Sequence, residues 1–110
     1  MRSLALTLAL MSLPPMAQAQ VTSQAVCDTT AVIVSKAQAL RMQGKTGPEA
    51  VEMLSAEYSD RSEAFRGSAI PMLVNDFVYL QPEAAMKEDL AAFWKQTCLS
   101  TDLSAVLPAD

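Results

Sequence analysis

Two cysteines, Cys27 and Cys98, constrain the fold of this chain more than any other feature of its sequence. They are the only cysteines in 110 residues, and they lie near the two ends of the part that remains after an N-terminal leader. In an oxidising compartment, an even pair of cysteines is best interpreted as one disulfide. Closing a loop of this length stabilises a small domain by roughly 4 kcal/mol on chain-entropy grounds. The two ends of the domain should therefore lie side by side.

The first 19 residues have the features of a cleaved secretory signal peptide. Arg2 supplies a positive start, residues 4–13 form an apolar run, and Ala17-Gln18-Ala19 offers a cleavage site after two prolines. A transmembrane anchor needs about 20 apolar residues, roughly twice the length of this run. We predict cleavage after Ala19, which removes 19 of 110 residues and leaves residues 20–110 as a single helical domain. The expected location is the periplasm or the cell exterior.

Export favours the disulfide over the other roles that the cysteines could have. A lipoprotein anchor needs its cysteine at the cleavage junction, and Cys27 lies well beyond Ala19. A redox pair is expected in a C-x-x-C arrangement, which the chain lacks. Two cysteines without any histidine are too few ligands for a zinc site. We therefore expect no metal and no cofactor.

The most apolar stretch after the leader, residues 67–82, is predicted to be a buried central helix. Ser68 is placed to cap its start, and Pro71 is tolerated in a first turn because the N–H it removes has no intrahelical acceptor. Gly67 is expected to separate this helix from a short helical turn over residues 60–65. The inward stripe falls at helical spacing. It comprises Ile70, Leu73, Val74, Phe77, Val78 and Leu80.

Three further helices are predicted around the central one. The first covers residues 24–43 and ends at Gly44, where glycine accepts a left-handed conformation. The second starts at a capping box formed by Thr46 and Glu49 and runs to about residue 59. The last starts with Pro82 in its first turn and reaches about residue 98, before a loosely packed tail from about residue 99. Its expected inward residues are Met86, Leu90, Phe93 and Trp94.

These elements predict an all-α fold, a small bundle of four to five helices closed by one disulfide. In an up-down-up-down bundle, the start of the first helix and the end of the fourth lie at the same end. Cys27 and Cys98 occupy those two places. An irregular packing of short helices would also satisfy the disulfide.

Charge and composition exclude several classes of function. After the leader, seven basic residues are scattered among twelve acidic ones. This argues against binding nucleic acid or an anionic membrane surface. The absence of histidine removes the commonest general base and excludes triads of the Ser-His-Asp or Cys-His type. We therefore expect that the protein is not an enzyme.

Polar residues interrupt the predicted central helix at Asn75 and Asp76. Together with Tyr79, an aromatic residue with a polar tip, they are the candidate interaction residues. The alternative is structural, with Asn75 and Asp76 on a narrow solvated stripe or Asp76 bonded to a neighbour such as Arg66.

The order of features resembles a group of small exported proteins of Gram-negative bacteria that share no agreed activity. The resemblance rests on Cys27 in a first helix that ends near Gly44 and on Gly-Pro-Glu-Ala at 47–50. It also rests on Val-Tyr-Leu-Gln-Pro at 78–82 and on Phe93 leading to Cys98. It implies a periplasmic helical domain and carries over no functional residues. Acid-stress periplasmic chaperones and periplasmic immunity proteins share the outline only.

These observations lead us to expect a non-catalytic module that binds another periplasmic protein, as an inhibitor, immunity factor or adaptor. One alternative is a small-molecule or lipid binder with a cavity beside Phe77, Tyr79 and Trp94. Another is a chaperone of the acid-stress type, which would expose apolar surface at low pH. The sequence leaves the oligomeric state open.

Overall fold

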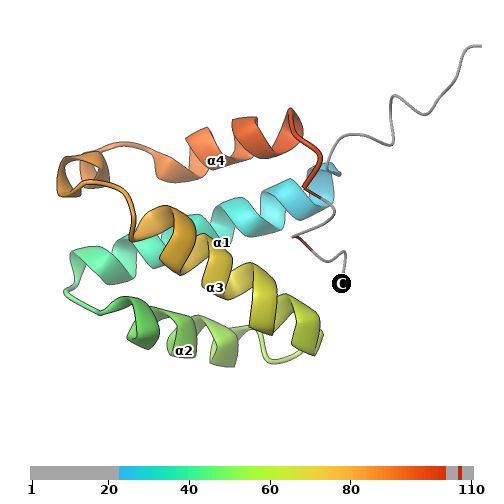
Figure 1. The fold of residues 1–110 in the computed structure, drawn as a ribbon, viewed down its shortest axis with the longest axis horizontal. Coiled ribbons are helices and arrows are strands. Elements are labelled where there is room, and N and C mark those ends of the chain that lie inside the picture. Colours follow the sequence, from blue (N-terminus) through green and yellow to red (C-terminus); the bar gives the residue numbers. More distant parts are fainter. Residues whose placement is uncertain (1–22, 104–106, 108–110) are drawn as a thin grey trace, which may run out of the picture.

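The computed structural model describes residues 23–103 and Leu107, and these residues form four α-helices and no strand. The helices are α1 (Gln24–Met42), α2 (Gly47–Glu57), α3 (Ile70–Leu73) and α4 (Leu90–Leu99). Successive helices run in opposite directions, and α1 lies between α4 and α2 (Figure 1). The all-α prediction is confirmed, while the predicted signal peptide lies outside the described residues.

The first two helices begin as predicted and end within about two residues of the predicted positions. The Ser23 hydroxyl caps α1 by accepting from the Val26 N–H at 3.3 Å, and Gly44 follows its end with a φ of 87°. Thr46 and Glu49 form the predicted capping box at the start of α2, with both reciprocal hydrogen bonds present at 2.8 and 3.2 Å. Because the Thr46 N–H and hydroxyl hold the Glu49 carboxylate in its charged form, its pKa lies below the ordinary value.

The predicted central helix begins earlier than expected, because Gly67 does not interrupt it, and it also ends earlier, at Val78. Residues 63–78 form one continuous helical segment in which α3 lies between two π-helical turns, Phe65–Ala69 and Val74–Val78. Pro71 therefore sits inside a helix rather than in its first turn, and Ser68 caps nothing. In a regular α-helix the proline ring would clash with the carbonyl of Gly67, and the preceding π-helical turn widens the backbone at that point. The Ile70 N–H accordingly donates to Phe65, five residues back.

The last helix starts later than predicted. Glu83–Lys87 forms a separate 3-10 helix, and α4 begins only after Asp89, whose carboxylate accepts from the Ala92 N–H at 3.0 Å. A long-range contact explains the break, since the Gln38 amide of α1 donates to the carbonyls of Met86 and Glu88, each at 2.9 Å. Those carbonyls are turned toward α1 instead of along a helix axis.

Two residues predicted to face inward are exposed instead. Leu80 is 71% exposed, because the helix ends at Val78 and the chain turns away. The Arg41 guanidinium stabilises this ending by donating to the carbonyls of Val78 and Gln81, both at 2.8 Å. Phe93 is 59% exposed, since α4 points Leu90, Trp94 and Cys98 into the core. The remaining core prediction holds for Ile70, Leu73, Val74, Val78, Met86, Leu90 and Trp94, with Phe77 partly buried.

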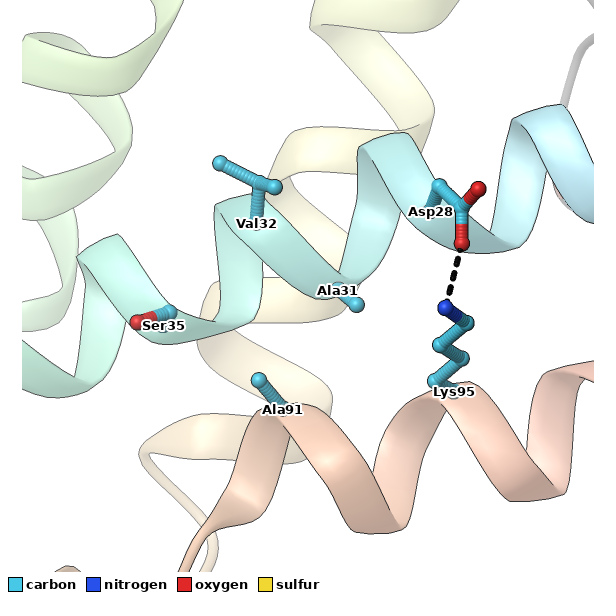
Figure 2. Close-up of a pocket in the computed structure, with 6 residues that line it drawn as sticks. All are labelled: Asp28, Ala31, Val32, Ser35, Ala91 and Lys95. Carbon is cyan, nitrogen blue, oxygen red and sulfur yellow. Dashed lines mark ion pairs between the residues drawn. The ribbon is translucent and has the colours of Figure 1, made fainter.

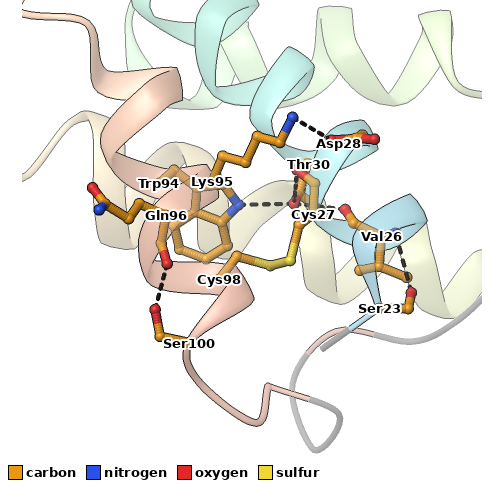
Figure 3. Close-up of a disulfide and its surroundings, with 10 residues drawn as sticks. All are labelled: Ser23, Val26, Cys27, Asp28, Thr30, Trp94, Lys95, Gln96, Cys98 and Ser100. Atoms are coloured by element: carbon orange, nitrogen blue, oxygen red, sulfur yellow. Dashed lines mark hydrogen bonds and ion pairs between the residues drawn. A yellow bond between two sulfur atoms is a disulfide. The ribbon is translucent and has the colours of Figure 1, made fainter. Parts of the chain in front are cut away.

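The predicted disulfide joins the start of α1 to the end of α4. Cys27 and Cys98 are fully buried, with their Cα atoms 5.7 Å apart (Figure 3). Beside it, the Trp94 Nε1–H donates to the Thr30 hydroxyl at 2.8 Å, and that hydroxyl donates to the Val26 carbonyl at 2.8 Å. The tail packs against this core through Leu103 and Leu107, and Leu107 is only 3% exposed.

Candidate functional site

Tyr79, one of the three candidate interaction residues, fastens the central helix to the connection between α1 and α2. Its hydroxyl donates to the Lys45 carbonyl at 2.7 Å, and its N–H donates to Val74 at 2.8 Å, closing the second π-helical turn. The Arg41 guanidinium lies 5.6 Å from the centre of its ring. Burial raises the pKa of the Tyr79 phenol above its ordinary value, against the opposing effect of Arg41. These contacts give Tyr79 a positioning role within the fold.

Asn75 and Asp76 are both exposed on the second π-helical turn. The Asn75 side chain lies against α2, where its Oδ1 would be 2.6 Å from a Cβ added at the buried Gly47. Arg66, the partner considered for Asp76, instead donates its Nε to the Arg61 carbonyl at 3.1 Å. The structure thus brings Asn75 and Tyr79 together against the start of α2. An interaction role for the three residues stays a prediction.

The aromatic residues that were candidates for lining a cavity pack against one another. The Phe77 ring lies 5.3 Å from the Trp94 ring and stacks on Phe93 at 6.2 Å, measured between ring centres. The Trp94 N–H donates its hydrogen bond to the Thr30 hydroxyl. Direct ring contact, rather than space for a ligand, therefore joins Phe77 to α4.

A shallow groove lies between α1 and α4 (Figure 2). Its volume is about 350 Å³ and its walls are formed mostly by small apolar side chains. An ion pair closes one end, with the Lys95 Nζ 2.8 Å from the Asp28 carboxylate. We call this the α1–α4 groove, lined by Asp28, Ala31, Val32, Ser35, Ala91 and Lys95.

A second groove, of about 310 Å³, lies between α1 and α2. It is also flanked by an ion pair, in which the Lys36 ammonium binds the Glu57 carboxylate and donates to the Tyr58 hydroxyl at 3.3 Å. The hydrogen bond to Glu57, followed by the one to Tyr58, raises the pKa of Lys36 above its ordinary value. We call this the α1–α2 groove, lined by Lys36, Ala39, Leu40, Met53, Leu54 and Glu57.

Beside these grooves, α1 presents a stripe that no described residue of the chain covers. We define the outer face of α1 as Val32, Ser35, Ala39 and Met42, all of which are exposed. Spacings of three and four residues place them on one side of the helix, opposite its buried residues. Val32 is 49% exposed and Met42 is 66% exposed, and Met53 of α2 adds a third apolar side chain at 45%. A third groove, of about 410 Å³, lies beside Met42 and is lined by Arg41, Met42, Gly44, Glu83, Met86 and Lys87. The outer face and the α1–α4 and α1–α2 grooves are the candidate binding surface.

Sequence reasoning missed this surface for a local reason. Val32 stands directly before Ile33 and Val34, which are fully buried, so the three read as one apolar run. Ser35 and Ala39 are small and indicate neither the inside nor the outside of a helix. The usable signal was the spacing 32, 35, 39 and 42, which places Val32 and Met42 away from the core stripe.

The described residues contain no group of three or more acidic, cysteine or histidine side chains that would hold a metal ion. Within the same residues, no helix combines the length and hydrophobicity needed to cross a bilayer. The chemistry that the site offers is apolar contact flanked by two ion pairs. No protein-family model, no curated protein and no solved structure matches the chain.

Proposed function

We propose that this chain is an exported, non-catalytic module that acts by binding another protein chain, as an inhibitor, immunity factor or adaptor. The observation that carries the proposal is the outer face of α1, where Val32 and Met42 are exposed and two apolar grooves adjoin the helix. Exposed apolar surface bordered by charged groups is typical of protein–protein contact sites. The ion pairs Asp28–Lys95 and Lys36–Glu57 supply such a border.

The proposal of export is supported by the leader-like first 19 residues and by the buried disulfide. Disulfides persist mainly in oxidising compartments, which makes the periplasm or the cell exterior the proposed location. The absence of histidine from the whole sequence supports a non-catalytic role, because most hydrolytic mechanisms need an imidazole base.

Affinity capture from a periplasmic extract of the natural host tests the proposal. The bait is the oxidised exported protein, compared with Val32→Glu on the outer face. Leu80→Glu is the matched control, because it adds the same charge at an exposed leucine outside that face. We expect a chain that is retained by the wild type and by Leu80→Glu but lost with Val32→Glu. Capture that Val32→Glu leaves unchanged, or an empty result after crosslinking, would contradict the proposal.

A second candidate function is the binding of a small apolar ligand in the α1–α4 groove. Its volume of about 350 Å³ falls at the lower end of the range of ligand pockets, and its walls are mostly carbon. A ligand at 100 times its Kd would stabilise the protein by about 2.7 kcal/mol. Thermal-shift screening of apolar compounds tests this, with Ala91→Leu as the variant that fills the groove. A shift that persists in Ala91→Leu would place the ligand elsewhere.

A further inference from the structure

We infer that the outer face of α1 is a homodimer interface, on which α1 of a second copy of this chain packs antiparallel. The inference rests on the proposed function, since it names a second copy as an occupant of the same surface, for which a different partner protein would compete. The spacing of the face, its charge, its shape and its size each bear on that choice of occupant.

The spacing of the outer face suits a helix. Val32, Ser35, Ala39 and Met42 are separated by three, four and three residues, and the exposed Ala25 and Asp28 continue the series toward the start of α1. An alternation of three and four is the repeat by which one helix packs along another. Within the domain this repeat faces away from the buried residues of α1, so the core does not use it.

The charge of the face permits two copies to meet. The sequence as a whole carries a net charge of −4, so two copies repel each other over most of their surfaces. The outer face is an exception, because the charges around it do not add to the negative total. Asp28–Lys95 and Lys36–Glu57 are ion pairs, and Met42 shares a groove with Arg41, Glu83 and Lys87. A like-charged partner therefore meets the least repulsion here.

The shape of the face is complementary to itself in an antiparallel arrangement. A twofold interface must present the same patch on both copies. With the axis beside Ser35, the larger Val32 of each copy faces the smaller Ala39 of the other, and the small Ser35 side chains meet at the axis. Met42 of each copy lies beside the Asp28–Lys95 pair of the other, where the lysine stem offers apolar contact. Antiparallel helices also bring opposite ends of their dipoles together.

The size of the face fits a weak dimer. A helix of 19 residues is about 28 Å long, and α1 with half of each neighbour spans about 20 Å at usual helix spacings. Two such faces bury roughly 1,100 Å², which is at the lower end for specific interfaces. We therefore expect dissociation constants in the micromolar range or above, and a monomer–dimer equilibrium that depends on concentration.

Sedimentation velocity of the oxidised exported protein, from about 1 µM to about 1 mM, tests the dimer. The wild type and Leu80→Glu should shift from monomer to dimer over this range, whereas Val32→Glu should remain monomeric. Because Val32 is exposed, the variant should fold, which circular dichroism and the retained disulfide check. A wild type that stays monomeric at 1 mM overturns the inference, as does a Val32→Glu variant that dimerises like the wild type.

Single cysteines on the outer face test the orientation, since the native disulfide is fully buried. Ser35→Cys should form a covalent dimer on mild oxidation. A mixture of Val32→Cys and Ala39→Cys should form mixed dimers in preference to either self-dimer. Thr97→Cys, exposed on α4, is the control that should stay monomeric. Preferred self-dimers at positions 32 and 39 would overturn the antiparallel arrangement.

The two proposals fail in different ways. A monomeric wild type that still captures another protein through Val32 would overturn the dimer and leave the proposed function standing. A monomeric wild type whose capture is empty or independent of Val32 would overturn both.

Discussion

The two ends of α1 are fixed to the rest of the molecule by different kinds of interaction. At its start, the Cys27–Cys98 bond and the buried Trp94–Thr30 hydrogen bond tie α1 to α4 (Figure 3). At its far end, polar side chains of α1 reach backbone carbonyls, with Arg41 on Val78 and Gln81 and Gln38 on Met86 and Glu88. The attachment of the first end depends on the redox state of the compartment. The attachment of the second end depends on two side chains that extend to backbone carbonyls.

Among the described residues, the outer face of α1 takes no part in fixing either end of the helix. Both ends are held by groups on the buried side of the helix or at its flanks, so neither fixation requires the outer face. A substitution at one end of α1 should therefore weaken the contacts of that end and leave those of the other end in place. Substitutions at each end can rank the contributions of the two ends to the free energy of unfolding.

The largest effect is expected at the disulfide end. Replacing both cysteines, as Cys27→Ser with Cys98→Ser, should lower the free energy of unfolding by roughly 4 kcal/mol, because the unfolded chain is no longer constrained by a long loop. Urea unfolding followed by circular dichroism measures the change, and the reduced wild-type protein is the matched comparison. A loss below about 1 kcal/mol would show that the polar end carries the stability of the domain.

At the polar end, Arg41→Met should lower the free energy of unfolding by about 2 kcal/mol. The substitution removes a charged donor from two carbonyls at the end of the central helix, and such hydrogen bonds contribute about 1.5–3 kcal/mol. Arg41→Lys keeps the charge but lacks the planar guanidinium that reaches both oxygens, and it should recover only part of the loss. Full recovery by lysine would indicate that charge, rather than geometry, fixes this end.

The hydrogen bond beside the disulfide should contribute about 1.5 kcal/mol. Thr30→Val keeps the shape of the side chain but leaves the buried Trp94 N–H without its acceptor, which costs about 1–3 kcal/mol. Trp94→Phe removes the donor, and the double variant closes a thermodynamic cycle. Strictly additive effects of the two substitutions would mean that the hydrogen bond contributes nothing to stability at the disulfide end of α1.

Signals confined to a few neighbouring residues predicted the fold well. The end of α1 followed from Gly44, and the start of α2 followed from Thr46 and Glu49. The disulfide was predicted because the chain has only two cysteines and they lie near the two ends of the domain. The observed helix topology brings them together. Each of these features depends on an interaction between near neighbours or on a covalent bond. Such features can be predicted from the sequence alone.

Long-range contacts account for the errors. Pro82 has the local features of a helix start, but Gln38, more than 40 residues away, holds Met86 and Glu88 in a different geometry. Pro71 indicates a first turn, yet the buried Phe65 and Ala69 extend the helix before it, and a π-helical turn accommodates the ring. The outer face was missed because the neighbours of α1 decide which side of the helix is buried. Val32 and Ile33 are similar residues on opposite sides of that boundary.

The smallest effect is expected beyond the polar end, at the capping box of α2. The folded pKa of Glu49 lies below its ordinary value of 4.5, because the Thr46 N–H and hydroxyl stabilise the carboxylate. A lowered folded pKa contributes stability above pH 4.5, and this contribution is lost as the pH falls through the folded pKa. Glu49→Gln should therefore be less stable than the wild type at pH 7 and should approach it at pH 2.

Urea unfolding at a series of pH values between 7 and 2 measures this convergence. Glu52→Gln, at an exposed acid of the same helix, is the matched control for the general loss of negative charge on acidification. If the Glu49→Gln difference from the wild type stays constant with pH, the cap acts through shape and not through charge. If Glu52→Gln converges in the same way, the acid sensitivity belongs to the net charge of the chain. If only Glu49→Gln approaches the wild-type stability as the pH falls, the ionised Glu49 side chain fixes the start of α2. The polar end of α1 would then be followed by a connection that depends on this one charge.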